Sequence, residues 1–163
     1  MIRTVRVEDA ISVVEIMNQA IEERKNAYLS PFEAKQGSDW FERLKASALA
    51  FVVKTDTRGD VCGWGTLTPY RSGRDAFQRA VEITFYFERA ARGLGWGKEM
   101  IEHLEQLSHT MGKHHLVAIL LDDNVPSQRL LVKMGYEEWG NFRELAEFPD
   151  RNRGHMYMGK RLT

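Results

Sequence analysis

The most constraining feature of the sequence is a strand, a glycine-rich turn and a helix that follow one another between residues 80 and 111. Residues 80–87 alternate in polarity, which predicts a strand with an apolar face of Val81, Ile83, Phe85 and Phe87. The opposite face would carry Glu82, Thr84 and Tyr86. After the turn, apolar residues recur at helical spacing from Met100 to Met111, and Gly112 ends the helix. This succession is typical of a mixed α/β fold.

The rest of the chain predicts further elements of such a fold. Before residue 80 we expect a strand over 2–7, a helix opening at Glu8 and Asp9, a helix from an N-cap at Ser38, and strands over 49–53 and 61–68. After the central helix we expect a buried strand over 115–121, a helix over 127–134, and strands over 136–145 and 155–162. Because no linker or repeat interrupts this order, residues 1–163 are predicted to form a single α/β domain.

Charge and composition exclude several classes of protein. Lys and Arg together number 23 and Asp and Glu number 23, which argues against a nucleic-acid binder. The single cysteine, Cys62, excludes an internal disulfide, and no histidine spacing suits a metal site. No apolar stretch is long enough for a signal peptide or a membrane span, so we expect a cytoplasmic protein without a membrane partner.

The turn Arg92-Gly93-Leu94-Gly95-Trp96-Gly97-Lys98 predicts a pyrophosphate site. Its glycines let backbone N–H groups point outward, and the helix start adds unpaired N–H groups and a partial positive charge. Arg92 and Lys98 flank the turn. A P-loop is excluded because Glu99 follows Lys98, and the dinucleotide spacing is also absent. The alternative is a tight turn that binds no ligand.

Two motifs resemble the GCN5-related N-acetyltransferases (GNAT). Residues 92–97 match the Q/R-x-x-G-x-G/A motif, and Asn124 to Leu130 with Lys133 to Tyr136 resemble that superfamily's downstream element. The resemblance implies a central mixed, mostly antiparallel twisted sheet flanked by helices, with acetyl-CoA as co-substrate and no metal. It places the backbone of Phe85 and Phe87 against the pantetheine arm, together with Asn124 and Ser127. Asn124 could instead cap the following helix, and Ser127 could be an ordinary first-turn residue.

Short stretches in both predicted N-terminal helices and in the loop around Arg74 are most similar to the phosphinothricin and L-amino-acid acetyltransferase branch. This likeness implies a small amine acceptor and a homodimer. Arg74 would bind an acceptor carboxylate through paired hydrogen bonds, with Arg71 as an alternative. Tyr86 is a further acceptor-binding candidate. Phe32 and Trp40 could line the acceptor pocket, or they could simply be core residues.

Glu82 is the candidate general base. A carboxylate within an apolar strand has its pKa raised by desolvation, and an amine must lose a proton before it attacks a thioester. The strand rise puts Phe87 roughly 16 Å from Glu82, a distance that a pantetheine arm can span. The resemblance assigns the matching glutamate the same role. The alternative is that Glu82 belongs to the polar face of a half-exposed strand.

Many superfamily members carry a tyrosine acid where this chain has Leu131. Tyr86, Tyr70 or water could replace it, so no general acid is assigned. The leading prediction is an enzyme that acetylates the primary amine of an amino acid or an amino-acid analogue. The alternatives are a non-catalytic acyl-CoA-binding or sensing module and an acetyltransferase of protein N-termini or lysines.

Overall fold

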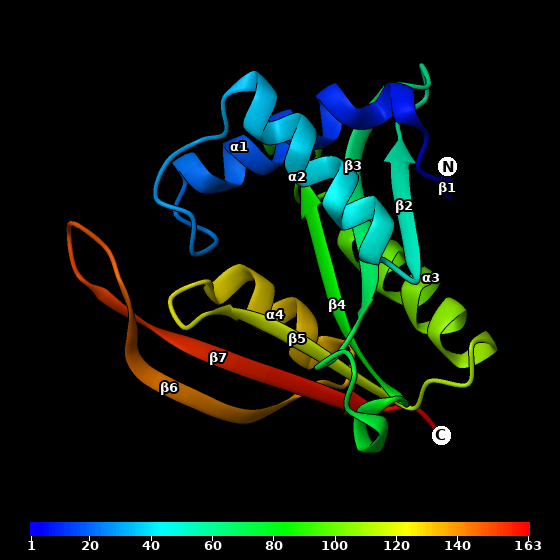
Figure 1. Ribbon diagram of the computed structural model, residues 1–163, viewed down its shortest axis with the longest axis vertical. Coiled ribbons are helices and arrows are strands. Elements are labelled where there is room, and N and C mark those ends of the chain that lie inside the picture. Colours follow the sequence, from blue (N-terminus) through cyan, green and yellow to red (C-terminus); the bar gives the residue numbers. More distant parts are fainter.

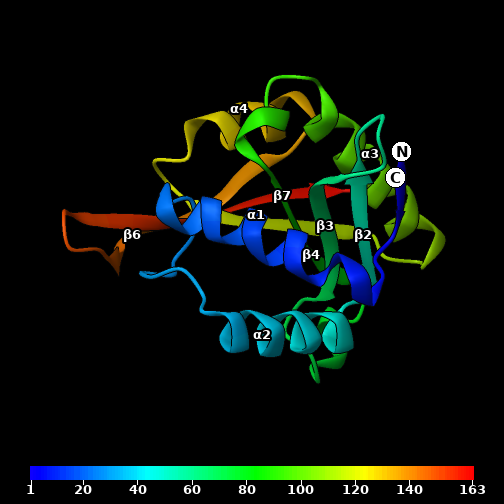
Figure 2. The same cartoon turned by 90° about the horizontal axis from the view of Figure 1, so that it is seen from above.

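The computed structural model describes all residues 1–163. One seven-stranded sheet, in the order β1-β2-β3-β4-β5-β7-β6, has helices on both faces (Figures 1 and 2). Its strands are β1 (Ile2–Thr4), β2 (Ala50–Thr55), β3 (Val61–Pro69), β4 (Ala80–Phe87), β5 (His115–Leu121), β6 (Glu137–Glu147) and β7 (Asn152–Arg161). The α-helices are α1 (Ala10–Glu22), α2 (Ala34–Ser47), α3 (Trp96–Thr110) and α4 (Val125–Lys133). None of them is long and apolar enough to cross a membrane.

The predicted order of elements is confirmed, and β4 and β5 have the predicted bounds. The prediction that Ser38 caps the second helix is wrong, because α2 begins at Ala34. Glu33 is its N-cap, with an extended backbone and a reciprocal capping box with Gln36. The N–H of Glu33 donates to the side-chain oxygen of Gln36 at 3.2 Å, so the chain is already capped before it reaches Ser38.

The apolar residues form two clusters on opposite faces of the sheet. One lies between the sheet and α3, where Val81, Ile83 and Leu104 are almost fully buried. The helix lies close to β3 because Gly65 has no side chain: a Cβ there would be 2.8 Å from the sulfur of Met100. The other cluster packs α1 and α2 against the first strands and includes Trp64. Figure 2 shows these two helix layers on either side of the sheet.

The sheet is split between β4 and β5. These parallel strands pair only where Ala80–Glu82 lie beside His115–Val117. Beyond Glu82 they diverge, while β4 keeps its antiparallel pairing with β3 as far as Phe87. The edge of β4 that faces β5 therefore has free backbone groups over residues 83–87, apart from the carbonyl of Phe87, which accepts from Arg92. An added peptide-like group can satisfy the free ones.

Candidate active site

A cavity of about 460 Å³ fills the opening between β4 and β5. We call it the cleft cavity. Residues 83–87 line one side, residues 118–120 line the other, and the glycine-rich turn closes one end. Most of the predicted cofactor residues line it: Phe85, Phe87, Arg92, Gly93, Gly95, Trp96, Gly97, Lys98, Asn124 and Ser127. Leu94 is the exception, because its side chain is exposed and lies outside the lining.

The turn has the backbone geometry of an anion cradle. Gly93 and Gly95 have φ angles of +77° and +83°, in the left-handed region that favours glycine. The amide N–H groups of residues 93–98 donate to no acceptor within the protein. The first backbone bond of α3 runs from the N–H of Glu99 to the carbonyl of Gly95, at 3.4 Å. These free donors at a helix start fit a pyrophosphate group.

Gly97 has a different role from the other two glycines. A Cβ at this position would lie 2.8 Å from Cδ2 of Leu130, so glycine lets the start of α3 approach α4. Because Leu130 also lines the cleft cavity, this close packing sets the width of the cavity beside the turn.

Buried Lys54 balances the charge of Glu99 in the first turn of α3. Its Nζ lies 2.7 and 2.9 Å from the two carboxylate oxygens of Glu99, and its side chain is only 8% exposed. Without this partner, the carboxylate would repel an anion bound at the same helix end. The ion pair therefore keeps the helix start suitable for a phosphate.

The two basic residues that flank the turn are placed differently. The guanidinium of Arg92 donates to the carbonyl of Phe87 at 3.2 Å and pairs with Glu23 at the end of α1. It therefore ties the turn to β4 and α1. Lys98 is exposed, with only Glu102 nearby at 3.5 Å. Lys25, three residues beyond α1, also lines the cavity. No local pattern predicts this, because only the tertiary fold brings the end of α1 to the cleft.

Polar residues near the end of α1 hold neighbouring segments. The side-chain amide of Asn18 bonds both the N–H and the carbonyl of Phe32, at 2.8 and 3.0 Å. The side chain of Gln19 accepts the N–H of Arg89, just before the turn, at 3.0 Å. Asn18 and Gln19 belong to the stretch of the first helix that resembles the phosphinothricin and L-amino-acid acetyltransferase branch, and in this structure both hold neighbouring segments in place.

Asn124 is 8% exposed and faces the cleft cavity. It occupies the N-cap position of α4, but its side chain makes no capping hydrogen bond. The capping alternative is therefore not what the structure shows. Ser127 and Leu131 line the same cavity, and Leu131 is almost fully buried.

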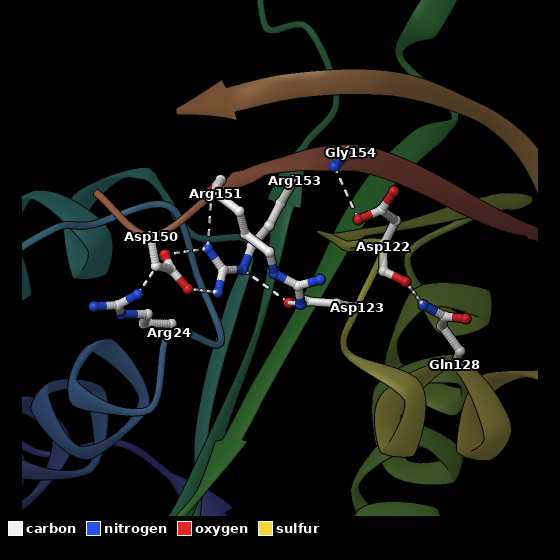
Figure 3. A network of polar contacts seen from close by, with 8 residues as sticks. All are labelled: Arg24, Asp122, Asp123, Gln128, Asp150, Arg151, Arg153 and Gly154. Atoms are coloured by element: carbon white, nitrogen blue, oxygen red, sulfur yellow. Dashed lines mark hydrogen bonds and ion pairs between the residues drawn. The ribbon is translucent and has the colours of Figure 1, made fainter. Parts of the chain in front are cut away.

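A polar network fixes the loop that carries Asn124 (Figure 3). The carboxylate of Asp122 accepts the N–H of Gly154 at 2.8 Å, and its carbonyl accepts the side chain of Gln128 at 2.7 Å. Buried Arg153 donates to Asp123 at 2.8 Å and to both carboxylate oxygens of Asp150 at 3.0 Å. Asp150 also pairs with Arg24 beyond α1. The network thus joins the β5–α4 loop to the start of β7 and to the other side of the cleft.

Glu82 lies where β4 and β5 are still paired, opposite Val117 of β5 and Thr68 of β3. Burial raises the pKa of this carboxyl, and a hydrogen bond from Thr84 opposes the shift in part. Tyr86 lies four residues further along β4, on the same face of the strand. Burial raises the pKa of its phenol to about 12, although a hydrogen bond with Asn26 lowers it in part. The half-buried carboxyl has the character expected of a general base.

A second cavity, of about 840 Å³, begins beside Ala80 and Val117. We call it the acceptor cavity. Arg71 lines it, whereas the predicted acceptor residue Arg74 does not. Phe32 and Trp40 line neither cavity, and their rings pack 5.4 Å apart, with Trp40 5.7 Å from Trp64. Tyr86 lines the cleft cavity instead. Elsewhere, no group of three or more His, Cys, Asp or Glu side chains is arranged to hold a metal ion.

The chain matches the family described as "Acetyltransferase (GNAT) domain" over residues 1–137. It therefore belongs to the GNAT acetyltransferase family. This match confirms the predicted superfamily and the acetyltransferase class, and the mixed seven-stranded sheet agrees with the predicted fold.

Several proteins named as amino-acid or phosphinothricin acyltransferases align with most of the chain. The Bacillus subtilis protein YwnH, assigned as a phosphinothricin acetyltransferase, is 28% identical over 95% of this chain and 94% of its own. The Escherichia coli L-amino acid N-acyltransferase MnaT is 27% identical, covering 83% of this chain and 78% of its own. A Sinorhizobium meliloti phosphinothricin acetyltransferase, solved in complex with acetyl-CoA, superposes with a TM-score of 0.90 at 23% identity, over 99% of this chain and 88% of its own.

Proposed function

We propose that the protein transfers the acetyl group of acetyl-CoA to the primary amine of a small molecule, an amino acid or an amino-acid analogue. The observation that carries this proposal is the position of Glu82 on β4, between residues that line one cavity and residues that line another, although Glu82 itself lines neither. The cleft cavity reaches Ile83 and Thr84, and the acceptor cavity reaches Ala80 and Val117. A thioester in the first and an amine in the second would meet beside one half-buried carboxyl.

Acetyl-CoA supplies an acetyl group activated as a thioester. The free N–H groups of residues 93–98 bind its pyrophosphate, and Lys98 and Lys25 add positive charge. The free edge of β4 over residues 83–87 hydrogen-bonds the amides of the pantetheine arm, as an added strand would. Asn124 and Ser127 contact the arm from the other side of the cleft.

Glu82 accepts a proton from the acceptor ammonium, which leaves a nitrogen lone pair free to attack. The amine attacks the thioester carbonyl directly, and the C–N bond forms as the C–S bond breaks. The raised pKa of Glu82 brings its basicity closer to that needed near neutral pH. After the attack the nitrogen must also lose its second proton, and the departing thiolate must gain one. Leu131 cannot donate this proton, so water, or the phenol of Tyr86 or Tyr70, passes it from the nitrogen to the sulfur.

The proposal also covers assembly and location. It takes residues 1–163 as one acetyltransferase domain in the cytoplasm, with no nucleic acid or membrane as partner. The equal numbers of basic and acidic residues and the free thiol of Cys62 support this placement. A homodimer is the assembly that the resemblance implies, and sedimentation of the purified protein tests it.

The test is release of CoA thiol with a panel of amino acids, amino-acid analogues, polyamines and peptides, with Glu82→Gln beside Glu42→Gln. Glu42 is an exposed residue of α2 and serves as the matched control. We expect turnover of small amino acids that only Glu82→Gln abolishes. Acetyl-CoA binding by calorimetry without turnover would favour the sensing module, and turnover of peptides alone would favour a protein acetyltransferase. Full activity of Glu82→Gln would disprove the base assignment.

A further inference from the structure

The acceptor cavity has an aromatic wall that segments far apart in the sequence build together. Its five aromatic residues are Tyr70, Phe77, Trp139, Phe142 and Tyr157. The rings of Tyr70 and Phe77 pack 5.6 Å apart edge to face, and those of Phe142 and Tyr157 also lie 5.6 Å apart. Edge-to-face pairs hold aromatic rings in fixed orientations. The wall is therefore a shaped surface rather than a loose group of side chains.

The wall leaves apolar area open to solvent. Phe77, Trp139 and Phe142 are 44%, 49% and 56% exposed. Trp139 can lie flat on β7 only because position 159 is glycine: a Cβ there would be 2.1 Å from the indole ring. Exposed aromatic surface around a cavity lowers the free energy of binding for any ligand that covers it with apolar groups.

Two guanidinium groups lie beside this wall without a carboxylate partner. Arg71 and Arg79 line the cavity, and neither side chain makes an ion pair or a hydrogen bond within the protein. Arg71 also has a left-handed backbone with a φ of +50°, which is unfavourable for a residue with a side chain. Strained residues gather at functional sites, and this one faces the cavity.

Tyr157 links the basic side of the cavity to Glu82. Burial raises the pKa of this phenol, Tyr70 and the negative charge of Glu82 raise it further, and the positive charge of Arg71 lowers it. The N–H of Tyr70, the residue before Arg71, donates to the carbonyl of Ala80 at 3.2 Å, so Arg71 follows directly on a residue paired with the start of β4, two residues before Glu82. A molecule with an ammonium at Glu82 and a carboxylate at Arg71 would have its remaining substituent beside the aromatic wall.

We propose that the preferred acceptor is an α-amino acid with an aromatic or similarly large apolar side chain, which binds against Phe77, Trp139 and Phe142 while Arg71 binds its carboxylate. This inference rests on the proposed acetylation of amino acids and makes it more specific. Acceptors with a charged side chain fit less well, because they leave the exposed ring area of the wall in contact with water.

The first arm of the test compares acceptors. Thiol release at saturating acetyl-CoA is measured with L-phenylalanine, L-alanine, L-glutamate and phosphinothricin. We expect kcat/KM for phenylalanine to exceed the values for glutamate and phosphinothricin by about tenfold or more. Faster turnover of either polar acceptor would overturn this inference and leave the proposed function intact. If no acceptor is acetylated, the proposed function itself fails.

The second arm changes the wall. Phe142→Ala is expected to lower kcat/KM for phenylalanine about tenfold and to change that for alanine less than about threefold. Leu145→Ala is the matched control, because Leu145 is also exposed on β6 but lies outside the cavity. Equal losses for both acceptors, together with a change in sedimentation, would mean that the rings bind a second copy of the chain, and would overturn the inference.

The third arm tests the contact between Arg71 and the acceptor carboxylate by removing first one group and then the other. Arg71→Met should lower kcat/KM for phenylalanine about 10- to 100-fold, mostly through KM. Its effect on phenethylamine, which is phenylalanine without the carboxylate, should be less than about threefold. Arg71→Lys should recover part of the loss, since the charge remains. Equal losses with phenylalanine and phenethylamine would show that Arg71 does not bind the carboxylate.

Discussion

The two cavities lined by β4 residues on either side of Glu82 differ in what they are made from. The cleft cavity presents mainly backbone groups, from the turn of residues 93–98 and the free edge of β4. The acceptor cavity presents side chains, among them five aromatic rings and two free guanidinium groups. Backbone groups recognise parts that every molecule of CoA carries, whereas side chains can differ from protein to protein. The two cavities therefore depend on different parts of the sequence.

The largest effect on activity is expected at Glu82. Glu82→Gln should lower kcat about 10²- to 10⁴-fold and leave the Kd for acetyl-CoA unchanged, because it removes only the proton acceptor. In the wild type, activity should rise with pH through the raised pKa of Glu82, and the variant should lose this acid limb. A pH series of kcat/KM measures both, and an unchanged profile would contradict the assignment.

The same substitution should stabilise the fold at neutral pH. Because the folded-state pKa of Glu82 is raised, the folded protein binds this proton more tightly than the unfolded chain does. Its favourable contribution is present at acidic pH and is lost as the pH rises through the shifted pKa. Thermal unfolding at pH 7 should therefore give a Tm for Glu82→Gln at or above that of the wild type. A lower Tm at pH 7 would argue against the raised pKa.

The next largest effect is expected in the cleft cavity alone. Gly95→Glu puts a side chain where φ is +83° and a negative charge beside the pyrophosphate site, so the Kd for acetyl-CoA should rise about 100-fold. Gly59→Glu is the matched control, since Gly59 has a φ of +92° in the β2–β3 turn, outside both cavities. Calorimetry should show weak binding only for the first variant. Equal binding of acetyl-CoA by both variants would mean that the turn of residues 93–98 does not bind the pyrophosphate.

A smaller effect is expected at Arg153, which acts on the cleft cavity from a distance. Arg153→Ala leaves Asp123 and Asp150 without their buried partner and should cost about 2 kcal/mol of stability. The β5–α4 loop would then hold Asn124 less firmly in the cleft cavity, so the KM for acetyl-CoA should rise about threefold. Arg153→Lys should recover part of the lost stability and part of the change in KM. Arg151→Ala removes an exposed partner of the same Asp123 and should change stability by less than about 0.5 kcal/mol. Similar losses in urea unfolding would contradict this difference.

The smallest effect is expected at Cys62, which lines neither cavity. Its thiol is buried, and burial raises its pKa to about 11. The native protein should therefore react slowly with a thiol reagent at pH 7 and quickly once unfolded. Cys62→Ala should leave both KM values unchanged, which would also show that this thiol does not disturb a thiol-release assay. Rapid labelling of the native protein would show that Cys62 is accessible.

The sequence predicted the cofactor side far better than the acceptor side. The bounds of β4 and the turn after it follow from polarity alternation and glycine spacing within about 20 residues. Arg74 was predicted from the family resemblance, with Arg71 as the alternative, and Arg71 is the one that lines the cavity. The left-handed backbone at Arg71 changes the direction of the chain there, and no local pattern predicts that.

Phe32 and Trp40 show that the sequence also does not tell a pocket residue from a core residue. Their residue types suit a binding pocket and a core equally well, and only the packing of α2 against β3 places them with Trp64. In the same way, Trp139, Phe142 and Tyr157 gave no signal in the sequence. They lie side by side because β6 and β7 pair beside β5.

The sequence by itself determined the order of elements, the glycine-rich turn at the start of α3 and the carboxylate within an apolar strand. Each depends on groups a few residues apart, whose geometry is set by backbone dihedral angles and by alternation. The tertiary structure alone decided where β4 and β5 part, and which side chains surround the acceptor. Both depend on the pairing of strands that are distant in the chain, since residues from Tyr70 to Tyr157 line a single cavity. Local geometry therefore encodes the donor site, and packing across the sheet encodes the acceptor site.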